Sequence, residues 1–186
     1  MNETDTQLVR LYLSTHDERH LEVLVQRNLP PVLSYLKTLT GNPDTAADIA
    51  QETFVKVWKN LKRFDQRKAF RTWLFTIAKR TAIDELRKRN ALPFSAMVSD
   101  DGVEFAETLA GSEPSPLELA DASRTEKLVA GAVGTLPATS ARVVGLRLYG
   151  DMTFAQIAGL TGTPLHTVKS MYRRALPLLR RLLPIR

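Results

Sequence analysis

The sequence of 186 residues contains no cysteine, only three histidines and no long apolar run. Without cysteine, neither a disulfide framework nor a thiolate zinc site can form. No stretch approaches the roughly 20 apolar residues that cross a bilayer, and the N-terminus is polar and acidic rather than basic and then apolar. These absences predict a cytoplasmic protein without stable membrane insertion.

The few histidines do not predict a metal centre. His16 and His20 stand four residues apart, as in some helical zinc sites, but the residue after the first is aspartate rather than glutamate. His166 lies far away in the chain, and the basic parts of the sequence offer only isolated acids such as Asp84 and Asp151. A metal-dependent nucleic-acid hydrolase needs clustered ligands. We therefore expect no metal, no cofactor and no enzymatic activity.

Charge divides the chain into three parts. Residues 1–90 carry 16 basic and 11 acidic side chains, residues 91–123 carry seven acids and no base, and residues 124–186 carry ten bases and two acids. The middle part also holds prolines and glycines without an apolar period, which is typical of a linker. We predict two small domains, 1–90 and 124–186, joined by an acidic flexible linker. Their basic character favours an acidic polymer as partner.

Apolar residues recur at helical spacing in both domains, which predicts an all-α fold. Asp44 is placed to cap the central helix of the first domain, and Ser115 is placed to cap the first helix of the second. We expect Pro30-Pro31 to break or kink one helix and Pro177 to kink the last, because proline lacks a donor and clashes with the preceding turn.

The helix after Asp44 has two different faces. At 100° per residue, the predicted core face holds Ala47, Ala50, Phe54, Val57, Trp58 and Leu61. The opposite stripe holds Asp48, Glu52, Val55 and Lys59. An apolar valine between acids and a lysine is compatible with a docking surface, and plain solvation is an equally open interpretation.

From Lys56 to Arg89 the chain has 12 basic residues against three acidic ones, interleaved with aromatics. Such a surface can hold phosphates and stack unpaired bases, although a bundle with all its aromatics in the core is an alternative. In the helix after this polar break, the predicted buried stripe is Phe70, Trp73, Leu74, Ile77 and Ala78. On the other face, Asp84 could orient Arg80 or Arg87 toward phosphate.

The C-terminal domain carries the most specific local pattern. Thr153 and Gln156 form a capping box, Gly162 makes a turn, and Thr163-Pro164 opens a second helix. This pattern predicts a helix-turn-helix, whose second helix enters the major groove. The outward residues would be Leu165, His166, Thr167, Lys169, Ser170, Arg173 and Arg174. An αα-hairpin used only for packing is the alternative.

Two stretches together resemble a known family. The run from Ala47 to Trp58, with Phe70-Arg-Thr-Trp-Leu and Ala82-Ile-Asp-Glu-Leu-Arg, resembles region 2 of bacterial sigma factors of the extracytoplasmic-function (ECF) group. The run from Leu136 through the helix-turn-helix to Ala175 resembles their region 4. Both motifs in this order, separated by a short linker, make the resemblance specific.

The resemblance implies promoter recognition for core RNA polymerase, with no small-molecule substrate and with an anti-sigma factor as a further partner. Docking on polymerase would involve Asp48, Gln51, Glu52 and Val55. The minus-ten element would meet Phe64, Asp65, Gln66, Arg67, Lys68, Phe70, Arg80, Asp84, Arg87 and Lys88. The minus-thirty-five element would be read by His166, Thr167, Lys169, Ser170 and Arg173, with Leu165 and Arg174 beside them.

Some residues depart from the sequence pattern of the family, and an alternative function also fits the sequence. Arg80 stands where the family commonly has asparagine, and Pro177 interrupts a helix that members usually continue. The resemblance would thread the linker acids Asp100, Asp101, Glu104 and Glu107 toward the active-site cleft of the polymerase. The alternative function is a one-component helix-turn-helix regulator with an N-terminal sensing domain, which would bind duplex promoter DNA without polymerase.

Overall fold

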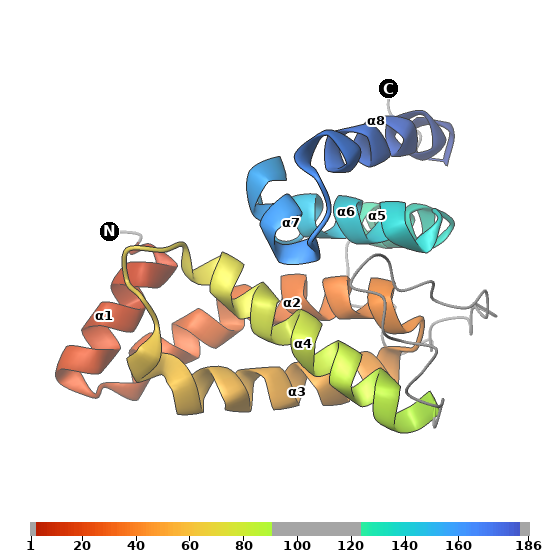
Figure 1. Cartoon of the computed structure of the whole chain (residues 1–186). Coiled ribbons are helices and arrows are strands. Elements are labelled where there is room, and N and C mark those ends of the chain that lie inside the picture. Colours follow the sequence, from red (N-terminus) through yellow and green to blue (C-terminus); the bar gives the residue numbers. More distant parts are fainter. Residues whose placement is uncertain (1–2, 91–123, 183–186) are drawn as a thin grey trace.

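A computed structural model of the chain describes residues 3–90 and 124–182, and all regular structure in these ranges is helical (Figure 1). The all-α prediction is therefore confirmed. The elements are α1 (Asp5–Thr15), α2 (Glu18–Thr40), α3 (Pro43–Asn60), the 3-10 turn η1 (Leu61–Arg63), α4 (Phe70–Asn90), α5 (Arg124–Gly134), α6 (Ala138–Leu148), α7 (Phe154–Thr161) and α8 (Leu165–Leu182). The linker acids and the predicted helix start at Ser115 lie outside the described residues.

The helix starts follow from local side-chain chemistry. Asn42, not Asp44, caps α3, because its Oδ1 accepts the backbone N–H of Thr45 at 2.9 Å. Pro43 occupies the first helical position, where its missing N–H costs nothing, so the cap falls one residue before it. Asp44 instead lies in the first turn, where a carboxylate is favourable to the helix dipole.

The prolines do not end the helices in which they stand. Helix α2 continues through Pro30 and Pro31, and α8 continues through Pro177 to Leu182. Buried Leu24 and Val32 lie on either side of the proline pair. Tertiary burial of one helix face stabilises the helix more than the missing hydrogen bonds destabilise it.

Helices α1 to α4 enclose the larger core. The rings of Tyr35 on α2 and Phe75 on α4 pack at 5.3 Å between centroids, and both side chains are fully buried. The same core extends into the C-terminal half through Val143, Leu146, Met152, Ile157 and Val168. A smaller core joins α5, α6 and α8 through Ala132, Val133, Leu136, Ala141, Val144, Ala175 and Leu179.

The two halves touch through α2 and α6, which lie side by side in Figure 1. Gly145 allows this approach, since a Cβ atom there would lie 3.3 Å from Oγ1 of Thr38 and 3.5 Å from a ring carbon of Tyr35. A second contact joins α4 to α7, where Nζ of Lys79 donates to the carbonyl of Leu160 at 2.8 Å. The domains are thus packed together rather than separate.

We expect Gly145→Leu to separate the halves, because the added side chain would collide with Thr38 and Tyr35. The measurement is the radius of gyration by small-angle X-ray scattering, which should rise while the helical circular dichroism is kept. Gly131→Leu is the matched control, since it also places leucine in a helix but has open space around it. Equal radii for the two variants would contradict the tight packing of α6 on α2.

Candidate functional site

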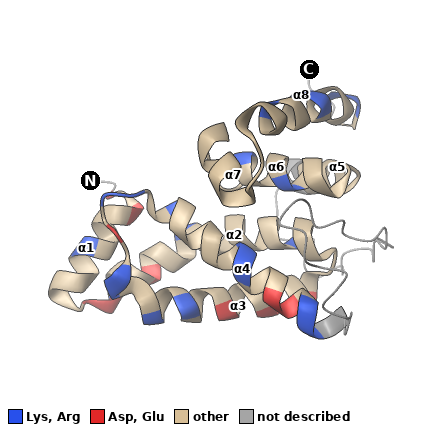
Figure 2. Cartoon of the chain, viewed as in Figure 1, with Lys and Arg blue, Asp and Glu red and all other residues tan. Residues whose placement is uncertain are grey.

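The predicted docking residues of α3 lie together on its outer side. Asp48, Gln51 and Val55 are exposed, and Glu52 is half-exposed with its Oε1 2.9 Å from Nζ of Lys56. Figure 2 shows acidic positions in the N-terminal part of α3 and basic ones toward its C-terminal end. The stripe therefore combines carboxylates with an apolar side chain that is 47% exposed, Val55.

The core face of α3 is rotated from the predicted one. Its buried residues are Thr45, Ala46, Ile49, Ala50, Thr53 and Val57. Ala47 is exposed, and Trp58 is 51% exposed with its ring 5.8 Å from that of Tyr12. The prediction that Trp58 is core is wrong, because the apolar arc of α3 is wider than the surface that α2 and α4 cover.

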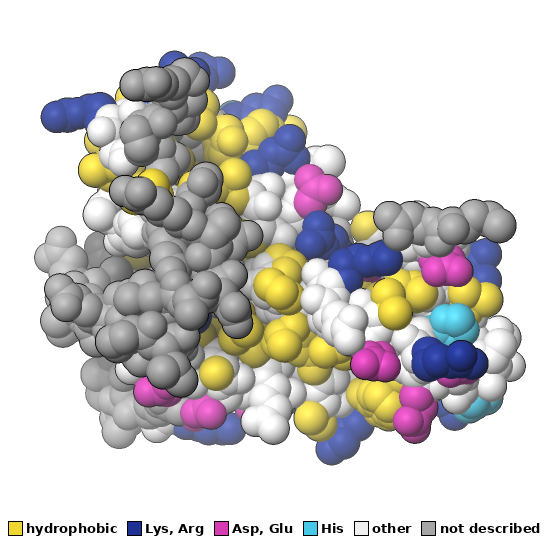
Figure 3. Space-filling view, turned by 180° about the vertical axis from the view of Figure 1, so that it is seen from behind, with side chains coloured by type: hydrophobic (Ala, Val, Ile, Leu, Met, Phe, Trp, Pro, Cys, Tyr) yellow, Lys and Arg dark blue, Asp and Glu magenta, His cyan; other side chains and the backbone are white. Residues whose placement is uncertain are grey.

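The uncovered part of that arc lines an apolar groove of about 690 Å³ between α2 and α3. Its walls are Val25, Leu29, Leu33, Ala47, Ala50, Gln51, Phe54, Val55, Trp58 and Lys59. Figure 3 shows hydrophobic side chains gathered across the middle of the face opposite to that of Figure 1. The groove adjoins the docking stripe, since Gln51 and Val55 belong to both.

The loop before α4 is anchored by aromatic packing. Phe64 is 5% and Phe70 is 2% exposed, and their rings meet edge to face at 5.6 Å. The ring centroid of Trp73 lies 5.1 Å from that of Phe64. Neither ring is exposed to solvent in this structure, because their mutual packing removes both from the surface. These rings fix the two ends of the loop instead.

Between the two phenylalanines, Asp65 organises a turn. Its Oδ1 accepts the backbone N–H and the Nε of Arg67, both at 3.1 Å, and its carbonyl accepts the N–H of Lys68 at 2.9 Å. The bond from the Arg67 guanidinium lowers the pKa of the Asp65 carboxyl. Arg67 and Lys68 are exposed. The loop therefore presents cations outward on a turn that the aspartate holds.

On α4, Arg80, Asp84, Arg87 and Lys88 are exposed, as predicted. Among the described residues, however, no ion pair joins Asp84 to either arginine, and Lys88 instead lies 3.6 Å from Glu85. Exposed pairs of this kind gain little in water, so the side chains stay solvated. The predicted orienting role of Asp84 is not seen in this structure.

Lys79 on the same helix is half-buried against α7. Burial lowers the pKa of its ammonium, and the nearby Arg142 and Arg80 lower it further. The residues around this contact form a cleft of about 460 Å³ lined by Thr72, Thr76, Lys79, Arg80, Ile83, Gln156, Gly159 and Leu160. Arg80, which belongs to the face of α4 predicted to meet the promoter, therefore lies in a cleft beside α7.

The helix-turn-helix is formed as predicted by α7 and α8. Oγ1 of Thr153 accepts the N–H of Gln156 while Oε1 of Gln156 accepts the N–H of Thr153, and Gly162 adopts a φ of 71° at the turn. Ile157 and Val168 are buried in the larger core, and Ala175 is buried in the smaller core with α5 and α6. The turn needs glycine because that φ is strained for other residues.

Helix α8 presents its predicted residues to solvent. Leu165, His166, Lys169, Arg173 and Arg174 are exposed, and Thr167 and Ser170 are half-exposed. Nη2 of Arg174 donates to Oγ of Ser170 at 2.9 Å, so these two side chains are joined one turn apart. The row can offer bidentate arginine and hydroxyl contacts to base edges and phosphates.

A polar network that was not predicted from the sequence lies beside the start of α4. Asn28 is fully buried and is bonded to Asp5 on α1 and to Arg71 on α4. One signal was available, because Asn28 falls on the apolar stripe of Leu21, Leu24 and Val32. A polar residue in a core register implies buried partners.

Two further observations concern the described ranges, 3–90 and 124–182. Within them, no three metal-binding side chains cluster. None of the helices described there has both the length and the apolarity that a bilayer crossing requires.

Comparison with known proteins gives matches to two family descriptions, Sigma-70 region 2 over residues 24–91 and Sigma-70 region 4 over residues 127–179. The ECF RNA polymerase sigma factor RpoE of Cereibacter sphaeroides is 30% identical over 175 residues, which cover 93% of this chain and 91% of that protein. The RNA polymerase sigma-H factor of Pseudomonas aeruginosa is 30% identical over 93% of this chain and 90% of its own length.

Solved structures show the same fold. The sigma factor RpoE of Bartonella quintana, in complex with the anti-sigma factor NepR, aligns over 91% of this chain and 99% of its own with a TM-score of 0.64 and 24% identity. CnrH, in complex with the cytosolic domain of CnrY, aligns over 97% of both chains with a TM-score of 0.61 and 22% identity.

The matches to Sigma-70 region 2 and region 4, in that order on this all-α fold, define a transcription initiation factor of the sigma-70 class. Within that class, the chain belongs to the ECF family of RNA polymerase sigma factors. Its function is to direct promoter-specific transcription initiation by core polymerase.

The position of Phe70 can be tested by stability. We expect Phe70→Ala to lower the free energy of unfolding by about 3–5 kcal/mol, because it empties a buried aromatic site. Lys68→Ala, two residues away and exposed, should change it by less than about 0.5 kcal/mol. Chemical denaturation measures both free energies of unfolding. A small effect of Phe70→Ala would contradict the burial of this ring.

Proposed function

We propose that residues 1–90 dock on core RNA polymerase and open the minus-ten element, while residues 124–186 read the minus-thirty-five element in the cytoplasm. The observation that carries this proposal is the separation of charge on one compact domain. The stripe of Asp48 and Glu52 and the cations Arg67 and Lys68 are held on different elements, α3 and the loop before α4. One body can thus bind a protein and a polyanion together.

The docking surface in this proposal is Asp48, Gln51, Glu52 and Val55. It meets the clamp coiled coil of the largest polymerase subunit, as the family resemblance implies. Exposed Val55 supplies apolar area, and the carboxylates supply complementarity to a basic partner, which mainly sets register and association rate. The adjoining groove with Trp58 extends the apolar area that a partner can cover.

The DNA surface begins at the loop. Gln66, Arg67 and Lys68 contact the extruded strand of the minus-ten element, and Arg80, Arg87 and Lys88 hold its phosphates. Unstacking a base costs free energy, which a pocket for the base and cations along the strand offset. Since Phe64 and Phe70 are buried, they act by holding the loop rather than by stacking on bases.

In the C-terminal half, α8 enters the major groove. His166, Thr167, Lys169, Ser170 and Arg173 face the minus-thirty-five element, with Leu165 and Arg174 at the edges of the contact. Their exposure on one helix after a glycine turn supports this assignment. An anti-sigma factor is a further proposed partner. RpoE of Bartonella quintana was solved in complex with the anti-sigma factor NepR, and CnrH was solved in complex with the cytosolic domain of CnrY.

Run-off transcription is the direct test of the whole proposal. Core polymerase with this chain should initiate at defined start sites on DNA of the source genome, and core polymerase alone should not. Strong binding of the free chain to duplex promoter DNA, without any polymerase-dependent transcript, would instead indicate a one-component regulator.

The docking stripe has its own test. We expect Asp48→Lys with Glu52→Lys to weaken binding to core polymerase at least about tenfold, because two charges at the contact are reversed. Asp44→Lys is the control, since it reverses an exposed acid in the first turn of the same helix. Fluorescence anisotropy of labelled protein measures the affinity, and unchanged affinity of the double variant would overturn the docking assignment.

A further inference from the structure

Helix α1 lies outside the segment that matches sigma-70 region 2, which begins at residue 24. It is nevertheless built into the domain, because Leu8 and Val9 are buried in the larger core. Its polar side chains connect to the middle of the loop before α4, from Arg10 to Gln66, and through Asp5 and Asn28 to Arg71 just after the loop. A helix beyond the matched segment is thus joined to the part of the domain that the proposed function places on DNA.

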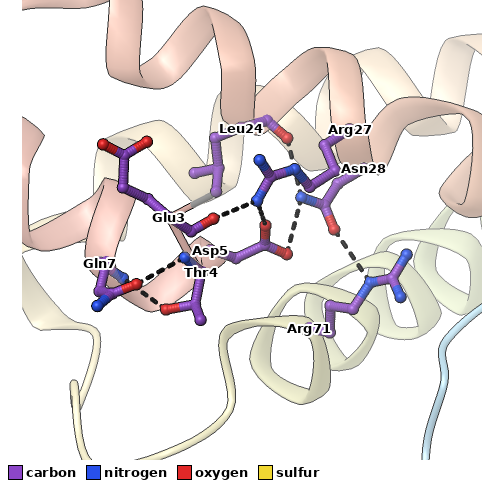
Figure 4. Close-up of polar contacts among 8 residues, drawn as sticks. All are labelled: Glu3, Thr4, Asp5, Gln7, Leu24, Arg27, Asn28 and Arg71. Atoms are coloured by element: carbon purple, nitrogen blue, oxygen red, sulfur yellow. Dashed lines mark hydrogen bonds and ion pairs between the residues drawn. The ribbon is translucent and has the colours of Figure 1, made fainter. Parts of the chain in front are cut away.

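The first connection runs through Asn28 of α2, whose side chain Figure 4 shows between Asp5 and Arg71. Nδ2 of Asn28 donates to the carbonyl of Leu24 at 2.9 Å and to Oδ2 of Asp5 at 3.1 Å. Its Oδ1 accepts from Nε of Arg71 at 3.3 Å. The amide therefore has a partner for each of its two N–H groups and for its oxygen, and its orientation is fixed.

Asp5 is itself held in place. Its Oδ1 accepts from Nη1 of Arg27 at 3.1 Å, and the same nitrogen donates to the carbonyl of Glu3 at 2.7 Å. The chain of bonds therefore runs from the start of α1 across α2 to Arg71, the second residue of α4. Since Phe70 precedes Arg71, this network fixes the end of the loop.

The second connection reaches the loop itself. Nε of Arg10 on α1 donates to Oε1 of Gln66 at 3.2 Å, across 56 positions of sequence. Gln66 lies between Asp65, which makes the turn, and Arg67, which is exposed. In the described part of the loop, this is the hydrogen bond that joins its middle to another helix.

We propose that α1 positions the loop for promoter opening. Arg10 acts through Gln66, and Asp5 acts through Asn28 of α2 and Arg71, so that Arg10 and Asn28 are positioning residues. The inference rests on the proposed function, because the loop must contact the minus-ten strand for its position to matter. A loop that is already ordered before DNA binds loses little conformational entropy on binding, so the strand is captured faster and bound more tightly. Arg10 itself touches no DNA in this account.

The experiment is a double-mutant cycle with holoenzyme on a promoter found by start-site mapping. Arg10→Ala should slow open-complex formation by about three- to tenfold, the size expected for one net hydrogen bond. Gln66→Ala should slow it at least as much, because it also removes the proposed contact of Gln66 with the strand. The double variant should be no slower than Gln66→Ala alone, because Arg10 acts through that amide. Permanganate reactivity of unpaired thymines measures the rate.

Two readouts separate positioning from a general structural role. The melting temperature and the affinity for core polymerase should stay unchanged in Arg10→Ala, since its bond is exposed. Arg19→Ala is the matched control, because it also removes one exposed arginine from the N-terminal helices, at a site bonded to Asp17. Equal slowing by Arg19→Ala, or additive slowing in the Arg10 and Gln66 double variant, would overturn the proposal.

The loop cations distinguish this inference from the function on which it rests. Slower opening by Arg67→Ala with Lys68→Ala, together with no effect of Arg10→Ala, would reject the role of α1 alone. If Arg67→Ala with Lys68→Ala left the rate of opening unchanged, the assignment of the loop to DNA would be rejected. Asn28→Ala should slow opening as well, and its lower melting temperature would report the buried bonds that it loses.

Discussion

Burial of α2 on several sides at once is the constraint on which the rest of this structure depends. The helix contacts α1, α3 and α4 of its own half and α5 and α6 of the other. Besides its apolar residues the helix carries a buried asparagine, Asn28, and Tyr35 is buried where α2 meets Phe75 and α6. Burial raises the pKa of the Tyr35 hydroxyl, which keeps it neutral. The acidic stripe, the groove and the cationic loop all lie on elements that α2 holds in place.

Much of this arrangement could be predicted from the sequence because short stretches of residues determine it. The capping box at Thr153, the glycine at 162 and the apolar spacing of Ile157 and Val168 are short-range signals, and they specify the helix-turn-helix without knowledge of the fold. The exposed face of Asp48 and Val55 follows from helical periodicity in the same way. Such signals need only the geometry of one helix or one turn.

The remaining features depend on partners far away in the chain. Trp58 is apolar and falls on a core-like face, yet no element covers it, and periodicity cannot report how many neighbours a helix has. Phe64 and Phe70 stand among cations and so look like base-stacking residues, but Trp73 and their own mutual contact bury them. The proline pair in α2 shows the same limit, because the packing on both sides decides whether the helix continues. Pairings such as Arg10 with Gln66 leave no local pattern at all.

The contact between Lys79 and Leu160 has a consequence for the charge of the side that is proposed to face DNA. In the packed arrangement, this ammonium is half-buried at the C-terminal end of α7, where the helix dipole is negative. A movement of α7 away from α4 would return Lys79 to water and raise its pKa toward the ordinary value. It would also expose the Lys79 ammonium beside Arg80, so the surface proposed to bind nucleic acid would gain a solvent-accessible cation.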